Sequence, residues 1–140
     1  MKRANSRSAL FLGEVVLSLL IFSLSAAVCV GLMFRAYHIS EASRDLNQAV
    51  FCAQSAAETF KSQPQLDKTA ALLGGIMQSG HCYVYYNNEW QLSGSKNAVF
   101  TMQIIPGMDE GIAYADIRLS KGQVPIFELT AAACDEGGGS

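Results

Sequence analysis

A run of twenty residues without a charge, Val15–Phe34, constrains this chain more than any other feature. An α-helix rises about 1.5 Å per residue, so the run spans roughly 30 Å, the thickness of the hydrocarbon core of a bilayer. Runs of this length are typical of membrane spans, and the alternative is a buried core helix of a soluble protein. We therefore expect one transmembrane helix over residues 10–35.

Basic residues precede this span and give it an orientation. Lys2, Arg3 and Arg7 stand before it, and the first acid is Glu14. By the positive-inside rule, the N-terminus stays in the cytoplasm and the rest of the chain lies outside, as in a single-pass protein of the cytoplasmic membrane. The alternative is a cleavable signal peptide, but its apolar region is usually only about 7–15 residues long.

Length and charge exclude two classes of function for the rest of the chain. The full length of 140 residues leaves room for one domain outside the membrane, not for a large multidomain enzyme. Residues 36–140 carry six basic and eleven acidic residues. Such an acidic surface offers no basic footprint for phosphates, so we expect no direct binding to nucleic acid.

The helix is expected to continue beyond the membrane, over residues 36–63. Apolar side chains recur there every seven residues, a second row of alanines runs beside them, and Pro64 ends the pattern. Many of these side chains are small, which favours close packing on a sheet, although a coiled coil is the alternative. The two rows are Ile39, Leu46, Ala53 and Phe60, and Ala42, Ala49 and Ala56, with Val50 and Ala57 alongside.

The last part of the chain has the composition of an antiparallel sheet. A linker over residues 64–80 is followed by a β-meander over residues 81–132, with strand-forming runs separated by turn residues. We expect an α+β fold in which a long N-terminal helix packs on a meander of about four strands. The head would cover residues 36–136, followed by a flexible tail, 137–140. The expected strands are Cys82–Tyr86, Ala98–Ile105, Ile112–Leu119 and Val124–Ala131.

Cysteines and aromatic residues are the remaining candidates for a site. Cys29 lies inside the span, and three cysteines lie in the head, where one disulfide is allowed. We favour Cys52–Cys82, with Cys82–Cys134 or no bridge as alternatives. An aromatic cluster in the head is either a ligand platform or a sheet face packed on a loop. Its members are Tyr83, Tyr85, Tyr86 and Trp90.

Motifs for catalysis, metal binding or cofactor binding do not stand out in the sequence. It contains no CxxC, HExxH, GxSxG or glycine-rich phosphate loop. We therefore expect a protein that is not an enzyme, with no catalytic residues, no metal site and no cofactor.

The N-terminus resembles that of type IV pilins and pseudopilins. A basic, polar leader, MKRANSRSA, precedes LFLGE and the apolar helix. In that family a prepilin peptidase cuts the leader, usually after Gly, and the new N-terminal residue, usually Phe, is methylated; a Glu stands at its fifth position. The resemblance places cleavage between Ala9 and Leu10, methylation on Leu10, and the family's Glu at Glu14. The segment QSAAETFKS and the Tyr-Tyr…Trp run look like small minor pilins of Gram-positive bacteria.

This resemblance implies a structural subunit of a type IV pilus or of a type II secretion-like filament. Its partners would be other pilin or pseudopilin subunits, the prepilin peptidase, a membrane assembly platform and the lipid bilayer. A carboxylate at the edge of the bilayer is costly unless a cation meets it. In a helix bundle that cation would be the α-amino group of Leu10 in an adjacent subunit, so that Glu14 sets the register between subunits.

Two alternatives to this interpretation follow from the same residues. Glu14 is also the kind of acid that the dipole of a helix favours near its N-terminus, by roughly 0.3–1 kcal/mol. The whole chain is also consistent with a single-pass anchored binding module that is not processed and does not polymerise.

Overall fold

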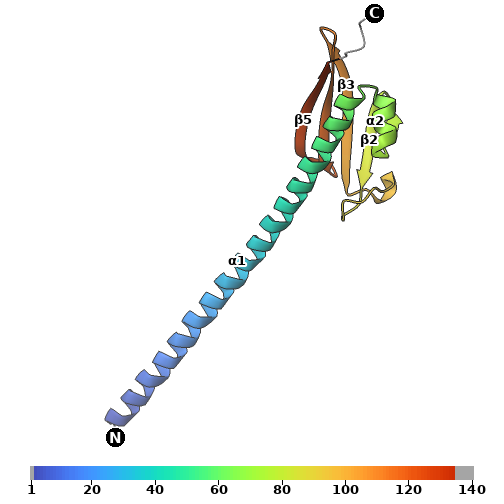
Figure 1. Cartoon of the computed structure of the whole chain (residues 1–140). Coiled ribbons are helices and arrows are strands. Elements are labelled where there is room, and N and C mark those ends of the chain that lie inside the picture. Colours follow the sequence, from blue (N-terminus) through green and yellow to red (C-terminus); the bar gives the residue numbers. More distant parts are fainter. Residues whose placement is uncertain (1, 135–140) are drawn as a thin grey trace, which may run out of the picture. The chain divides into compact units, whose positions relative to one another are not determined.

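The computed structural model describes the backbone of residues 2–134 and the side chains of residues 6–133. The expected tail, residues 137–140, lies outside this range. The chain divides into two compact units, Met1–Ser43 and Arg44–Ser140. Helix α1, Lys2–Ser62, begins in the first unit and ends in the second, and Figure 1 shows it as the blue-to-green helix.

The first unit consists of the N-terminal part of α1. From Ser6 onward all its described side chains are exposed, and the most apolar stretch has a mean hydropathy of 2.6. This helix is long and apolar enough to cross a membrane once. Three of its serines donate their hydroxyl groups to backbone carbonyls four residues back, which satisfies these hydroxyls within the helix itself. The bonds join Ser18 to Glu14, Ser23 to Leu19 and Ser25 to Ile21, at 2.8–2.9 Å.

The second unit is a five-stranded antiparallel sheet covered by helices on one face. The strands follow one another in chain order, β1-β2-β3-β4-β5. The predicted α+β class, with a long helix on a β-meander, is therefore confirmed. The remaining elements are α2, Leu66–Leu73; β1, Ile76–Gln78; β2, His81–Tyr86; a 3₁₀ turn, η1, Ser95–Asn97; β3, Phe100–Asp109; β4, Ile112–Lys121; and β5, Val124–Cys134.

Every strand adds to the predicted runs, and β2 begins one residue earlier, at His81, and β4 ends two residues later, at Lys121. The expected linker contains the short strand β1. Strand β3 continues through Pro106 to Asp109, although Pro106 was expected to end it. Because β2 pairs with β3 only as far as Ile104, Pro106 lies where β3 is an edge on that side, and its missing N–H removes no bond there. Strand β5 runs three residues beyond the expected Ala131.

The core lies between the alanine-rich face of α1 and the inner face of the sheet. Ala49, Ala53, Ala56 and Phe60 are at most 1% exposed, as their spacing predicts. The small alanine side chains leave room for the larger side chains of the strands. Against them pack buried side chains from every strand from β2 to β5: Cys82, Val84, Tyr86, Phe100, Met102, Ile104, Ala115, Ile117, Leu119, Ala131 and Ala133.

The lower part of the predicted stripe is not buried. Ile39 is 67% exposed and Leu46 is 42% exposed, and Ala42 is exposed as well. The expectation that the buried face begins at Ile39 is therefore wrong. Burial begins at Ala49, since that is where the core cluster with the strands starts.

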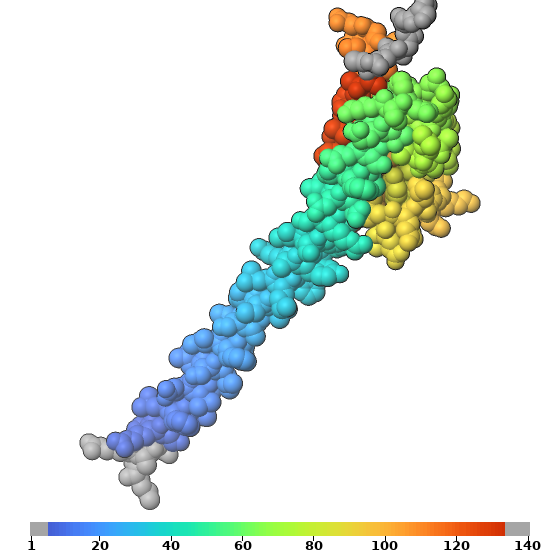
Figure 2. Space-filling view, in the orientation of Figure 1, coloured from blue at the N-terminus to red at the C-terminus, as the bar shows by residue number. Residues whose placement is uncertain are grey.

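Helix α2 completes the cover on the same face of the sheet. Figure 2 shows the green end of α1 beside the yellow-green α2 on this face. Thr69 is fully buried and donates its hydroxyl to the carbonyls of Gln63 and Gln65, which ties α2 to the end of α1. Gly74 closes α2 in the left-handed conformation, at φ 68°, where a side chain would be strained.

Candidate functional site

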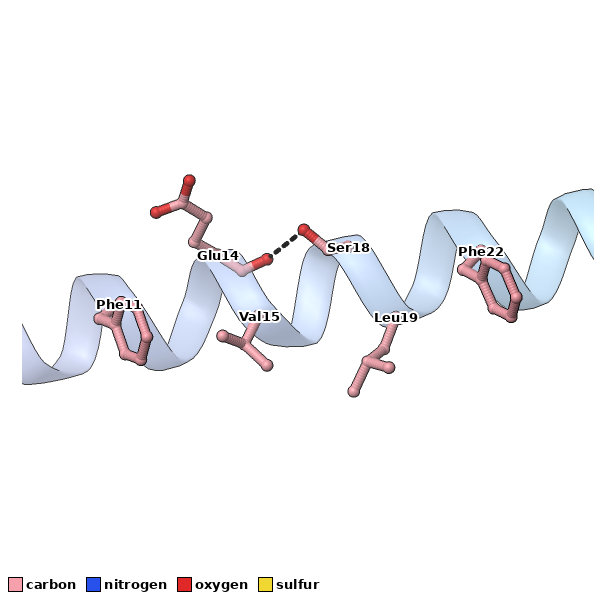
Figure 3. Close-up of a pocket in the computed structure, with 6 residues that line it drawn as sticks. All are labelled: Phe11, Glu14, Val15, Ser18, Leu19 and Phe22. Atoms are coloured by element: carbon pink, nitrogen blue, oxygen red, sulfur yellow. Dashed lines mark hydrogen bonds between the residues drawn. The ribbon is translucent and has the colours of Figure 1, made fainter.

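Glu14 lies on an exposed face of α1 inside the apolar part of the helix. A shallow groove on the helix surface is lined by Glu14 together with apolar side chains and one serine. In Figure 3 the apolar side chains point to one side of the helix, and the Glu14 carboxylate points away from them. The lining residues are Phe11, Glu14, Val15, Ser18, Leu19 and Phe22.

The spacing of these residues describes a helix-packing surface. Residues 11, 14, 15 and 18 occupy positions i, i+3, i+4 and i+7, and residues 15, 18, 19 and 22 repeat this pattern four residues later. Four residues at these positions form the hole into which a side chain of a neighbouring helix inserts. Glu14 stands at the border of the first hole, and Ser18, a small residue, belongs to both holes. The groove can therefore receive a second helix, with a carboxylate at its edge.

The predicted processing positions lie one turn before Glu14. Ala9 and Leu10 are both helical and exposed, and Leu10 is 74% exposed. α1 is continuous through both residues, so the backbone of Leu10 lies four positions before Glu14 on the same helix. Among the described side chains no cation forms an ion pair with Glu14. The leader side chains of residues 1–5 lie outside the described range.

Cys52 on α1 and Cys82 on β2 both belong to the core: Cys82 is buried in it, and Cys52 packs against it. Both carry free thiols in this structure, and the hydroxyl of Tyr86 forms a hydrogen bond with Cys52. Burial raises the pKa of both thiols above the ordinary value of 9.0. Burial likewise raises the pKa of Tyr86, and the two neighbouring thiols add to this effect. The Cys52–Cys82 bridge stays a prediction, and the side chain of Cys134 lies outside the described range.

A polar cluster that sequence reasoning missed joins α1 to the end of β4 and to the loop after β2, on the face of the sheet that the helices cover. Asp45 on α1 accepts a hydrogen bond from the ammonium group of Lys121 on β4, at 2.8 Å, and a longer one from the indole N–H of Trp90, at 3.5 Å. Trp90 stacks on Phe100 with 4.1 Å between ring centroids, and Lys121 lies over the same ring. Asp45 and Lys121 are 76 positions apart, so no local pattern signals their contact.

The predicted aromatic cluster divides between the two faces of the sheet. Tyr86 is buried and contacts Trp90 on the core side. Tyr83 and Tyr85 are half-buried and lie on the opposite face, with parallel rings. Because side chains alternate along a strand, Tyr85 and Tyr86 could not have shared a face. The cluster is thus two separate groups, one structural and one open to solvent.

The side chains described here do not gather into a metal site. Among residues with described side chains, no group of three His, Cys, Asp or Glu lies close enough to hold a metal ion. A scan against protein-family models found no match, and searches of curated proteins and of solved structures found no matching protein either. The functional interpretation therefore depends on the geometry of the chain itself.

Proposed function

We propose that this protein is a membrane-anchored structural subunit, a minor pilin or pseudopilin, that assembles with other subunits through its N-terminal helix. The observation that carries the proposal is Glu14: a single acid within an exposed apolar helix, at the border of a groove shaped for another helix. A carboxylate in this position is costly in lipid. Because no described side chain of this chain forms an ion pair with it, its cationic partner would come from elsewhere.

The groove and the carboxylate have different roles in this proposal. Packing of small and apolar side chains around Ser18 would hold two helices together, since helices in lipid associate by close packing. The carboxylate of Glu14 would fix their relative height, because only one axial offset brings it against the α-amino group of Leu10 in the next subunit. A buried pair of this kind acts on register more than on net stability.

The resemblance of the leader supports the same function. Cleavage between Ala9 and Leu10 would create the amine that Glu14 needs, and methylation would modify that same nitrogen. The subunit would wait in the cytoplasmic membrane with its N-terminus in the cytoplasm and its head outside. A prepilin peptidase, an assembly platform and other subunits are the partners that this function requires.

Substitution of Glu14 tests the role of the carboxylate. Removing one partner of a buried ion pair costs about 3–5 kcal/mol, so incorporation of Glu14→Ala into filaments in the native host should fall at least about tenfold. Glu14→Gln keeps the shape and loses the charge, so it should fail equally. The matched control is Glu41→Ala, which removes an exposed acid from α1 beyond the apolar stretch. All three variants should reach the membrane in normal amounts, and normal incorporation of Glu14→Ala would refute the proposal.

The mass of the native N-terminus separates this function from its main alternative. Loss of residues 1–9 together with a methyl group on Leu10 supports a processed filament subunit. An intact N-terminus, with protein that sediments only with membranes, supports a single-pass anchored binding module instead.

A further inference from the structure

The face of the sheet opposite the helices carries a second candidate site. Both helices belong to the core on the inner face, which takes alternate residues of each strand. The outer face presents the intervening residues, and these are half-buried or exposed. They include Ile76 on β1; His81, Tyr83 and Tyr85 on β2; Thr101, Gln103 and Ile105 on β3; Ile112, Tyr114, Asp116, Arg118 and Ser120 on β4; and Glu128 and Thr130 on β5.

The strand register arranges these side chains in rows across the sheet. Tyr83 lies opposite Gln103, Gln103 opposite Arg118, and Arg118 opposite Glu128. Ile76 on β1 lies opposite Tyr83, so one row crosses all five strands. In a neighbouring row Tyr85 lies opposite Thr101. The face thus has an aromatic end, Tyr83 and Tyr85, and a polar end, Arg118 and Glu128. The amide of Gln103 lies between them.

Hydrogen bonds hold the rows in place without any ligand. The amide nitrogen of Gln103 donates to the hydroxyl of Tyr83 at 3.1 Å and contacts Nδ1 of His81 at 3.4 Å. The Nε–H of Arg118 donates to Glu128 at 2.7 Å. A ligand that binds here therefore loses little affinity to the ordering of side chains.

The aromatic end offers ring surface for apolar contact. The rings of Tyr83 and Tyr85 are nearly parallel, with an interplanar angle of 11° and 6.4 Å between their centroids. Both are half-buried, so each ring is fixed by its neighbours and still meets solvent. Rigid tyrosines combine apolar surface with a hydroxyl group and cost little entropy when they bind.

The polar end offers both donors and acceptors. The bond to Glu128 engages the Nε–H of Arg118, and the guanidinium group has four further N–H donors. The Gln103 bonds use its amide nitrogen, and its amide oxygen is an acceptor. Thr101 adds a hydroxyl. A ligand with many hydroxyl groups, each a donor and an acceptor, matches such a mixed surface.

Charge and apolar content decide what kind of ligand fits. The two acids, Asp116 and Glu128, outnumber the one base, Arg118, which disfavours phosphates and other polyanions. A protein partner would need apolar anchors at its centre. Ile76 on β1, 56% exposed and opposite Tyr83, is a large exposed apolar side chain of the row, but it lies on an edge strand and not at the centre of the face. Phe51, Leu72 and Met108 are not among the residues of the rows.

We infer that this outer face binds a neutral glycan, with pyranose rings against Tyr83 and Tyr85 and sugar hydroxyls bonded to Gln103 and Arg118. This inference goes beyond filament assembly and does not depend on it, because no residue of α1 takes part.

The test is binding of neutral oligosaccharides to the full chain in phosphatidylcholine nanodiscs, measured by isothermal titration calorimetry. The probes are hexamers of β-1,4-linked glucose and of β-1,4-linked N-acetylglucosamine, with heparin as the anionic comparison. We expect saturable binding of at least one neutral hexamer and none of heparin. Loss of one contact worth about 1.4 kcal/mol corresponds to tenfold weaker binding. This is the effect expected for Tyr85→Ala, which removes an aromatic contact, and for Gln103→Ala, which removes hydrogen bonds.

The control variant is Tyr37→Ala, which removes a 70% exposed tyrosine from the N-terminal unit of the chain. It should bind the glycan as the unchanged protein does, and Tyr85→Phe should keep most of the affinity because the ring remains. Three results would overturn the inference: no binding of either hexamer, binding that Tyr85→Ala and Gln103→Ala leave unchanged, or binding of heparin alone. Thermal unfolding of each variant shows whether the head is still folded.

Discussion

The contact of Asp45 with Lys121 and Trp90 predicts how firmly the sheet is held on α1. The substitution Asp45→Asn removes the charge and keeps the size of the side chain. Lys121 then loses its carboxylate partner at 2.8 Å, while Trp90 can still donate to the new amide oxygen. Lys121 also stays over the ring of Phe100, so only the charged contact is removed.

The exposure of the two side chains sets the size of the effect. Asp45 is 14% exposed and Lys121 is 43% exposed, so the pair is neither buried nor fully solvated. Exposed pairs contribute about 0–1 kcal/mol, and hydrogen bonds to charged groups in more protected positions about 1.5–3 kcal/mol. After allowance for solvent screening at Lys121, we expect Asp45→Asn to lower the free energy of unfolding by about 1 kcal/mol. In a head of this size that corresponds to a fall in Tm of about 4–8 °C.

The single tryptophan of the chain provides the assay. Trp90 lies in this cluster, so its fluorescence reports unfolding of the head in the full chain in nanodiscs. A double-mutant cycle with Lys121→Met isolates the pair, and its coupling energy should be about 0.5–1 kcal/mol. The control, Asp109→Asn, removes an exposed acid from the end of β3. If the double variant is destabilised by the full sum of the single effects, Asp45 and Lys121 are not coupled and the reasoning is refuted.

Two further predictions concern the core. Phe60 is 1% exposed and Phe51 is 68% exposed on the same helix, so Phe60→Ala should cost about 3–5 kcal/mol by denaturant unfolding and Phe51→Ala much less; equal effects would contradict the assigned helix face. Burial raises the pKa of the Cys52 and Cys82 thiols, so these thiols ionise at lower pH in the unfolded chain than in the folded one. Their contribution to the free energy of unfolding is therefore constant below about pH 9 and should fall as the pH rises above it. Unchanged denaturation midpoints at about pH 8 and pH 10 would contradict this, and a thiol count on native protein tests the Cys52–Cys82 bridge directly.

The parts of the fold that sequence predicted are those with a repeating pattern. The uncharged run and the alanine rows mark α1, because both extend over many helical turns. On β4 the alternation of Asp116 and Arg118 with Ile117 and Leu119 matches the alternation of exposed or half-buried and buried side chains. In each case the signal lies within one element, where spacing alone decides which side a residue faces.

The parts that sequence did not predict depend on contacts between distant elements. The apolar pattern on α1 extends to residues before Ala49, but the buried surface does not, because Ile39 and Leu46 are exposed. Trp90 adopts a positive φ of 60°, and the neighbouring residues in the loop do not predict this conformation. Its indole is held from two sides, by Asp45 and by Phe100, and these contacts are visible only in the folded chain.

Of the candidate site, the sequence located Glu14 but not the groove beside it. The leader and the apolar run indicate the importance of Glu14 in the sequence. The two adjacent holes around Ser18 are visible only in the structure. Its role in register stays a prediction, as do cleavage after Ala9 and methylation of Leu10.

The order of the strands bears on how this protein is made. Each strand pairs with the one synthesised just before it, and α1, which carries the alanine face, is complete before the first strand appears. Within the sheet such sequential pairing closes only short loops, which favours fast formation of the hairpins. The head can therefore be built one hairpin at a time as the chain emerges, with no strand left waiting for a distant partner.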